Sequence, residues 1–152
     1  MILVSACLVG TRCRYDGGGY DRYPELSRMV EEGRALPVCP EQLGGLPTPR
    51  PPAEIQAGDG TDVLAGNARI TRQDGTDVTA EFLAGARKTL EIARLHGASA
   101  AILKARSPSC GCKQVYDGRF DGTLKPGKGV TAAMLEEAGL AVYDEDDSPP
   151  SQ

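Results

Sequence analysis

The sequence predicts an α/β fold, a single domain with a mostly parallel, Rossmann-like sheet flanked by helices. Short apolar runs of strand length alternate with segments that have helical spacing of apolar residues. This alternation is typical of a parallel sheet whose strands are joined by helical crossovers. The 152 residues suit one domain. We expect the domain to span residues 1–145 and the acidic, proline-containing residues 146–152 to form a flexible tail.

Four apolar runs are the predicted strands, at residues 2–9, 35–39, 100–104 and 140–143. Each is short and almost free of charge, which is typical of strands buried on both faces. The chain has no Trp, two Phe and five Tyr. The core must therefore consist mainly of Ala, Val, Ile and Leu.

Three segments are predicted helices, at residues 24–33, 77–96 and 130–138, because their apolar residues recur every three or four positions. In the longest of them, Asp77 is a suitable N-cap and Gly97 a suitable C′ residue.

The segment 44–72 is rich in proline and glycine and is predicted to be a long loop. Long loops within compact domains tend to be functional.

Composition excludes several functional classes. The net charge of −4 and the pI near 5.0 give no electrostatic reason to expect a large nucleic acid as partner. No apolar stretch approaches the roughly 18–20 residues of a membrane span, and the start of the chain lacks the features of a signal peptide. We expect a cytoplasmic protein whose partner is a small molecule.

In a reducing compartment structural disulfides are rare, so we expect the five cysteines to have another use. Cys7 lies near the end of the first predicted strand, Cys39 ends the second, and Cys110 follows the third. Because the carboxyl ends of parallel strands form one edge of a sheet, these three thiols should meet there. Cys13 and Cys112 lie in the same loops. Each cysteine alone could also be a small buried apolar residue.

A metal centre is the predicted use of these thiols. A structural zinc site would favour closely spaced cysteine pairs, but the sequence has no C-x-x-C. The single histidine, His96, ends the long helix and is expected to interact with the helix dipole rather than a metal. An iron–sulfur cluster held by three cysteines fits, since it leaves one iron open to substrate. The alternatives are a structural zinc or redox-sensing module, and an enzyme with Cys110 as nucleophile.

Polar residues beside the cysteines are candidates for catalysis. Glu41, two residues after Cys39, could act as general base or acid, although a glutamate at a helix start also favours the dipole. Ser107 and Ser109 precede Cys110, in a turn where hydroxyls often bond nearby backbone.

Substrate contacts are expected from Asp16, Ser109 and Lys104, although Asp16 is also typical of a turn. Lys104 belongs to a set of basic residues that could surround the site: Arg12, Arg14, Lys104, Arg106 and Lys113.

Three separated motifs resemble those of the thiouracil desulfidases, in the same order and over nearly the whole chain. They are VSACLVG at 4–10 with CRYDG at 13–17, VCPE at 38–41 followed by GGLPTPR at 44–50, and KARSPSCG at 104–111 with YDG at 116–118. The resemblance implies a [4Fe–4S] cluster on three cysteines, with a fourth iron that takes sulfur from a thiolated base such as 2-thiouracil. Water replaces the sulfur, giving uracil and sulfide without net redox change.

The resemblance also implies roles for individual residues. Cys39 and Cys110 fall on motif cysteines, and Glu41 and Ser107 fall on catalytic positions. The opening motif holds both Cys7 and Cys13; the strand-end argument favours Cys7, with Cys13 as the alternative. Cys112 lies outside the motif. Related chains with an added second domain resemble enzymes that act on thiolated RNA nucleosides, so for the single domain expected here the resemblance favours a free base or nucleoside.

Overall fold

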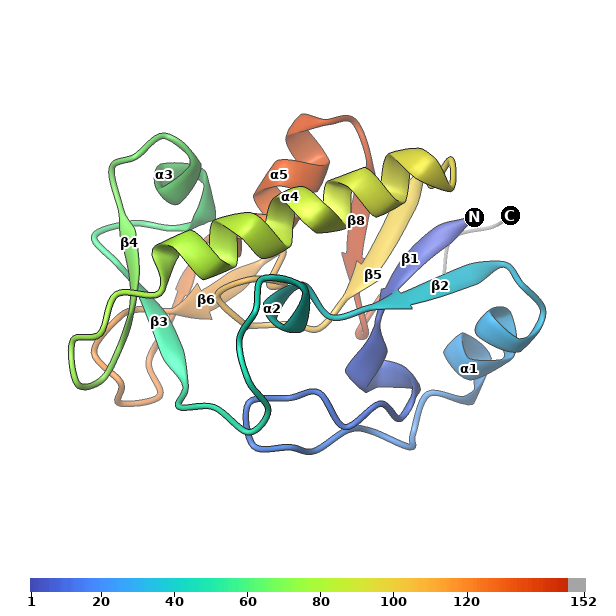
Figure 1. The fold of residues 1–152 in the computed structure, drawn as a ribbon, viewed down its shortest axis with the longest axis horizontal. Coiled ribbons are helices and arrows are strands. Elements are labelled where there is room, and N and C mark those ends of the chain that lie inside the picture. The colour runs from blue at the N-terminus through green and yellow to red at the C-terminus, as the bar shows by residue number, and fades with distance from the viewer. Residues whose placement is uncertain (148–152) are drawn as a thin grey trace.

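A four-stranded parallel sheet forms the centre of the molecule, and the computed structural model describes residues 1–147 (Figure 1). The sheet order is β2-β1-β5-β8, with every neighbouring pair parallel. The strands are β1 (Ile2–Ser5), β2 (Ala35–Val38), β5 (Ala100–Leu103) and β8 (Ala141–Asp144). The predicted α/β class is confirmed.

Helices cover both faces of this sheet. On β1, Ile2 and Val4 pack in one apolar cluster with α1, whereas Leu3 faces a second cluster with α4 and α5. This alternation follows from the two-residue period of a strand. The three predicted helices are confirmed as α1 (Pro24–Glu31), α4 (Thr79–Leu95) and α5 (Val130–Glu137).

The prediction of a long loop over residues 44–72 is wrong. The segment contains three regular elements, β3 (Ala53–Gln56), α3 (Gly60–Leu64) and β4 (Arg69–Arg72), and β3 pairs antiparallel with β4. A third apolar cluster lies beneath these elements and includes Ile55, Ile70 and Phe82 of α4. The antiparallel hairpin of β6 (Gln114–Tyr116) and β7 (Leu124–Pro126) contributes Val115 to the same cluster.

The first predicted strand is shorter than expected. It ends at Ser5, and residues Ala6–Val9 form a 3-10 helix, η1. This helix ends at Gly10, whose φ of +96° lies in the left-handed region that favours glycine.

The long helix also differs from expectation at its start. It begins at Thr79, so Val78 rather than Asp77 is the N-cap residue. Asp77 Oδ1 still accepts a hydrogen bond from the Thr79 N–H (2.8 Å) and so satisfies one of the free amides of the first turn. Gly97, with φ +64°, follows the helix end as predicted.

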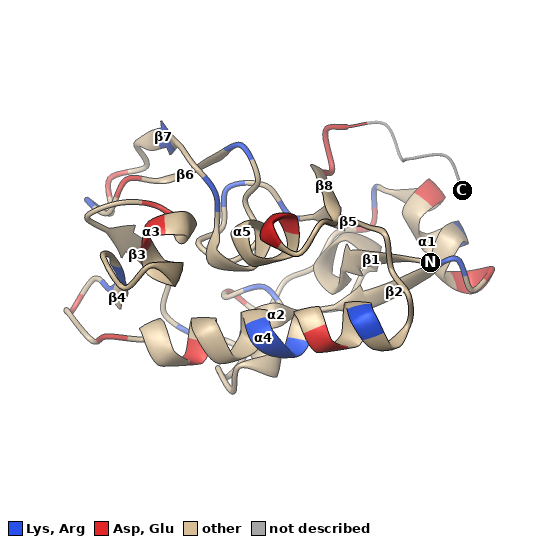
Figure 2. Ribbon diagram, turned by 90° about the horizontal axis from the view of Figure 1, so that it is seen from above, with Lys and Arg blue, Asp and Glu red and all other residues tan. Residues whose placement is uncertain are grey.

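A backbone-to-backbone contact fixes the short helix α2 (Pro40–Leu43) on α4. A Cβ placed on Gly85 would lie 1.9 Å from the Pro40 carbonyl oxygen, and one on Gly44 would lie 2.0 Å from the Glu81 carbonyl oxygen. Only glycine permits this approach. The exposed side of α4 carries charges of both signs (Figure 2).

The end of the described chain is tied to the domain. Asp144 and Asp147 both bind the Lys113 ammonium, at 3.2 and 3.0 Å. The remainder of the predicted tail, residues 148–152, lies outside the described residues. Within residues 1–147, no helix combines the length and apolar character that crossing a bilayer requires.

Candidate active site

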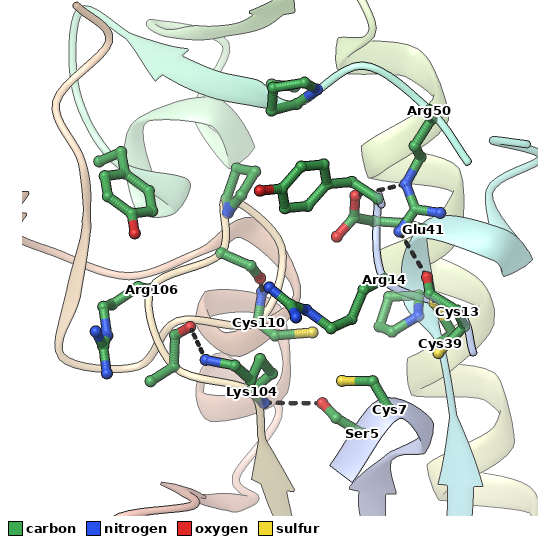
Figure 3. A pocket seen from close by; sticks show the side chains of 18 of the residues that line it. Ser5, Cys7, Cys13, Arg14, Cys39, Glu41, Arg50, Lys104, Arg106 and Cys110 are labelled. Carbon is green, nitrogen blue, oxygen red and sulfur yellow. Dashed lines mark hydrogen bonds and ion pairs between the residues drawn. The ribbon is translucent and has the colours of Figure 1, made fainter. Parts of the chain in front are cut away.

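Four of the five cysteines line one cavity of about 540 Å³ at the carboxyl edge of the parallel sheet (Figure 3). Cys7 lies in η1 directly after β1, Cys39 follows β2, and Cys110 lies in the loop after β5. Cys13 joins them from the loop after η1. The chain passes from β1 to β2 on one side and returns to β5 on the other, and such switch points form ligand crevices in α/β sheets.

The thiols of Cys7, Cys13 and Cys39 interact with one another. The Cys39 thiol lies 3.8 Å from the Cys13 carbonyl oxygen, to which it donates. The hydrogen bond with Cys39 lowers the pKa of Cys13, but the hydrogen bond with Cys7 and burial outweigh it and raise that pKa to about 11. The hydrogen bond with Cys13, followed by burial, raises the pKa of Cys39 strongly. Cys13 therefore lies beside Cys39 and also beside Cys7, the other candidate for the first ligand.

Cys110 approaches from the opposite wall, on the loop that follows β5. Burial is the main cause that raises the pKa of its thiol to about 12, and the charge of Glu41 adds to it. Ser107 Oγ accepts a hydrogen bond from the Cys110 N–H (2.7 Å), which fixes the turn that presents the thiol. Nearby, a Cβ on Gly129 would lie 2.4 Å from the Ser109 carbonyl oxygen, so α5 begins in direct contact with this turn.

The donor set fits a cluster better than a single zinc ion. Zinc on thiolates, at about 2.3 Å each, holds tetrahedral sulfurs roughly 3.8 Å apart. Within residues 1–147, one group of three potential metal ligands has its ligand atoms within 4.8 Å of one another: Cys112, Asp144 and Asp147. Among the same residues, no three of the cavity cysteines have their sulfur atoms that close together. Cysteines that hold separate irons of a cluster are spaced more widely.

The fifth cysteine, Cys112, lies apart from the other four. Its thiol points to Asp144 Oδ2 (3.9 Å), and the Lys113 ammonium already binds Asp144 and Asp147. It does not line the cavity.

Glu41 lies in the first turn of α2 and lines the cavity beside the thiols. Arg50 Nε donates to its Oε1 at 3.1 Å, and the side chains are 3% (Arg50) and 17% (Glu41) exposed. Burial raises the pKa of Glu41, although the charge and hydrogen bond of Arg50 act in the opposite direction. The carboxyl group is thus desolvated next to the proposed metal ligands.

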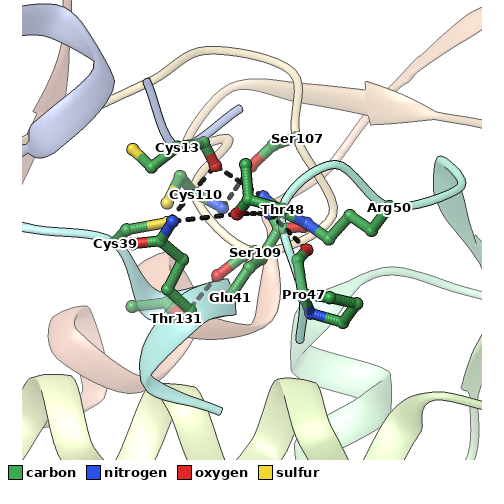
Figure 4. A network of polar contacts seen from close by, with 11 residues as sticks. Cys13, Cys39, Glu41, Pro47, Thr48, Arg50, Ser107, Ser109, Cys110 and Thr131 are labelled. Atoms are coloured by element: carbon green, nitrogen blue, oxygen red, sulfur yellow. Dashed lines mark hydrogen bonds and ion pairs between the residues drawn. The ribbon is translucent and has the colours of Figure 1, made fainter. Parts of the chain in front are cut away.

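Arg50 is a site residue that the sequence alone did not reveal. Its guanidinium also donates to the carbonyl oxygens of Cys13 (2.9 Å) and Pro47 (3.2 Å) and to Thr48 Oγ1 (3.0 Å) (Figure 4). One buried cation therefore joins the Cys13 loop, the loop after α2 and Glu41. Its place in the GGLPTPR motif is the only signal that could have singled it out.

The other predicted site residues divide into two groups. Ser107 and Lys104 line the cavity. Ser109 does not: it is 1% exposed and its hydroxyl bonds Thr131 Oγ1 at 2.7 Å. Asp16 also lies outside the lining, where its Oδ1 accepts the Gly18 N–H (2.8 Å), as in a turn.

Ser5 is a further cavity residue that sequence reasoning missed. Its Oγ accepts the Lys104 N–H (2.9 Å), and the hydroxyls of Ser5 and Ser109 act on the Cys110 thiol in the direction that lowers its pKa, against the larger effect of burial. The Lys104 ammonium pairs with Glu145 Oε2 at 2.9 Å, so the residue after β8 supports the same wall.

The lining of the cavity includes aromatic and basic side chains. Of the five tyrosines and two phenylalanines in the chain, four line it: Tyr15, Tyr20, Tyr116 and Phe120. The Arg14 guanidinium lies 4.8 Å from the Tyr20 ring centroid, and the Lys104 ammonium 5.7 Å from it. Of the predicted basic set, Arg14, Lys104 and Arg106 line the cavity, whereas Arg12 and Lys113 do not.

Comparison with known proteins identifies the class to which this fold and this cysteine-lined cavity belong. The model of the 2-thiouracil desulfurase family matches residues 2–147. The chain belongs to this family, and the predicted resemblance is confirmed.

Two individual proteins are similar over nearly the whole chain. The uncharacterized protein YbbK of Bacillus subtilis (strain 168) is 49% identical over 147 residues, which are 97% of each chain. A solved structure of TudS, described as a [4Fe-4S]-dependent thiouracil desulfidase, superposes with a TM-score of 0.84 at 44% identity, covering 95% of this chain and 90% of the other.

Proposed function

We propose that this protein is a [4Fe–4S]-dependent desulfidase that converts a thiolated base or nucleoside, such as 2-thiouracil, into the oxo compound and sulfide. The observation that carries the proposal is one cavity lined by four cysteine thiols, a buried carboxyl group and four aromatic side chains. Family membership and the similarity to TudS support the same reading. The cavity volume falls in the range of small-molecule sites.

Cys39 and Cys110 would hold the cluster together with Cys7, and Cys13 is the alternative third ligand. When bound, the cluster supplies a Lewis acid and a sulfur acceptor at the iron without a cysteine. The reaction is balanced as thiocarbonyl plus water giving carbonyl plus hydrogen sulfide, so no external oxidant or reductant is needed.

Glu41 is the proposed general base. Arg50 holds Oε1, and Oε2 would take a proton from the water that attacks the thiocarbonyl carbon. Ser107 Oγ accepts the Cys110 N–H, which leaves its own proton for donation to the substrate. Lys104 and Arg14 are cationic side chains of the cavity lining, paired with Glu145 (2.9 Å) and Asp16 (3.6 Å).

The decisive experiment measures sulfide release from a panel of thiobases after anaerobic reconstitution with iron and sulfide. Glu41→Gln should keep the visible absorbance of the cluster and lose turnover by roughly 10²- to 10⁴-fold, the range for a general acid–base group. Ser107→Ala should lie between this variant and the wild type, because water can replace a hydroxyl. Glu25→Gln, an exposed glutamate on α1, is the matched control.

Two results would contradict the proposal, and a third measurement assigns the first ligand. Zinc in place of iron in the purified protein would favour a structural or redox-sensing module. Full activity of Glu41→Gln would remove this residue from the mechanism. Iron content of Cys7→Ser and Cys13→Ser decides the first ligand, since only the variant that lacks a ligand should fail to retain a full cluster.

A further inference from the structure

The loop between β6 and β7 holds an aromatic side chain in an unfavourable backbone conformation. Phe120 has φ +57°, in the left-handed region where a bulky residue is a clear outlier. Within residues 1–147, the other non-glycine residues with positive φ are Ala57 and Arg106. Phe120 and Arg106 both line the cavity. Strained conformations that persist at a ligand site point to a functional constraint.

A buried carboxylate holds this loop in place. Glu54, on β3, is 8% exposed, and its Oε1 accepts hydrogen bonds from the N–H groups of Gly118 (2.9 Å) and Phe120 (3.2 Å). Gln56 Nε2 donates to the Gly118 carbonyl oxygen at 2.8 Å. Three hydrogen bonds therefore tie the loop to β3 and maintain the conformation of Phe120.

The hydrogen bonds of Glu54 account for a carboxylate in the cavity wall. A carboxylate in a cavity wall is a candidate acid or base, but Oε1 of Glu54 already accepts two backbone amides. Its position is explained by the loop that it orders. The thiols and Glu41 lie on other segments, after β1, β2 and β5.

We propose that Phe120 is a specificity-determining residue whose ring stacks on the planar heteroaromatic ring of the substrate, and that Glu54 is the positioning residue that holds it there. This inference rests on the proposed function, because it concerns how that cavity selects its substrate. Stacking on an aromatic ring favours the binding of any planar base, whereas it contributes little to the binding of an aliphatic thioamide. Tyr15, Tyr20 and Tyr116 are further aromatic side chains of the same lining.

The test replaces the ring while keeping the backbone conformation. Glycine and asparagine both tolerate positive φ, so Phe120→Gly and Phe120→Asn remove the ring without adding strain. We expect roughly a tenfold rise in KM for 2-thiouracil, with kcat within about twofold, because stacking binds substrate and transition state alike. The dissociation constant of uracil, measured by equilibrium dialysis, should rise by the same factor. The visible spectrum of the cluster and the Tm should not fall.

Variants of Glu54 test its positioning role, and one of them is a control. Glu54→Gln retains an oxygen acceptor and should behave as the wild type. Glu54→Ala releases the loop and should raise KM and the uracil dissociation constant as Phe120→Asn does, with faster amide exchange at residues 117–122. Phe120→Tyr keeps a ring and should leave both constants unchanged.

The outcomes separate this inference from the proposed function. If the wild type releases sulfide but Phe120→Asn leaves KM and the uracil dissociation constant within twofold, Phe120 has no role in specificity and the desulfidase proposal stands. If the wild type releases no sulfide from any thiobase, the proposed function is wrong, and unchanged uracil binding in Phe120→Asn would overturn the stacking role as well.

Discussion

Arg50 offers the sharpest test of how the site is held together. Replacing it with Met keeps a stem of similar length and removes the guanidinium. Four hydrogen bonds would be lost, to Glu41 Oε1, to two backbone carbonyls and to Thr48 Oγ1. The Glu41 carboxyl group would remain buried without its cation.

The expected magnitude follows from the burial of the pair. The side chains of Arg50 and Glu41 are 3% and 17% exposed. Removing one partner of a buried pair costs roughly 3–5 kcal/mol, most of it from the charge left behind. The double variant Arg50→Met/Glu41→Gln has no such charge, so it should be less destabilised than Arg50→Met alone. A cost of this size is a large part of the roughly 5–15 kcal/mol that stabilises an ordinary domain.

The assay is anaerobic urea unfolding followed by far-ultraviolet circular dichroism. It is performed on the reconstituted protein and repeated on metal-free protein, with Arg12→Met, at an exposed arginine, as control. A loss below about 1 kcal/mol in Arg50→Met would mean that the pair contributes no more than an exposed ion pair, and the reasoning would fail. Equal loss in the single and double variants would assign the effect to packing instead.

Two further perturbations test other parts of the structure. Gly85→Ala places a methyl group against the Pro40 carbonyl oxygen, so it should displace α2, lower the Tm and reduce desulfidase activity. The control is Gly97→Ala: no atom lies within 4 Å of the added Cβ, but φ is +64°, so this variant should lower only the Tm. Hydrogen bonds from Thr79, and then Arg69, hold the pKa of Asp77 at about 2. Because this folded-state pKa is depressed, its stabilisation is present above about pH 4 and is lost as the pH falls toward 2. The wild type and Asp77→Asn should differ in unfolding free energy by less than about 1 kcal/mol, because the Asp77–Arg69 pair is exposed. This difference should shrink as the pH falls from about 4 to about 2, and a difference that stays constant would contradict the prediction.

The strands and helices that could be predicted are those with an uninterrupted apolar pattern. Residues 2–5 and 100–103 are buried throughout, and their apolar runs are visible in the sequence. By contrast, β3 and β4 each have a single fully buried apolar residue at their centre, Ile55 and Ile70, between polar neighbours. A pattern of one residue cannot be recognised between prolines and glycines, which is why 44–72 was predicted to be a loop.

For the site, topology could be predicted, but the partners of individual side chains could not. Strand ends bring Cys7, Cys39 and Cys110 to one cavity, as the parallel sheet requires. Arginine is almost never fully buried unless it is paired, and the partner of Arg50 is known only from the fold. Likewise, nothing in the sequence distinguishes the hydroxyl of Ser109, which Thr131 occupies, from that of Ser107.

The cysteines of the cavity and the strands that carry its 117–122 loop are built on different apolar clusters, and this has a consequence for redesign. The cysteines belong to or pack against the clusters on the two faces of the parallel sheet, whereas β3 and β6 pack on the separate cluster around Ile55 and Phe82. We therefore expect substitutions in the 117–122 loop to leave the packing that presents the thiols in place. Libraries of variants confined to that loop offer a route to desulfidases for differently shaped thiobases. The residues of the metal centre would stay unchanged while the loop that carries Phe120 is varied.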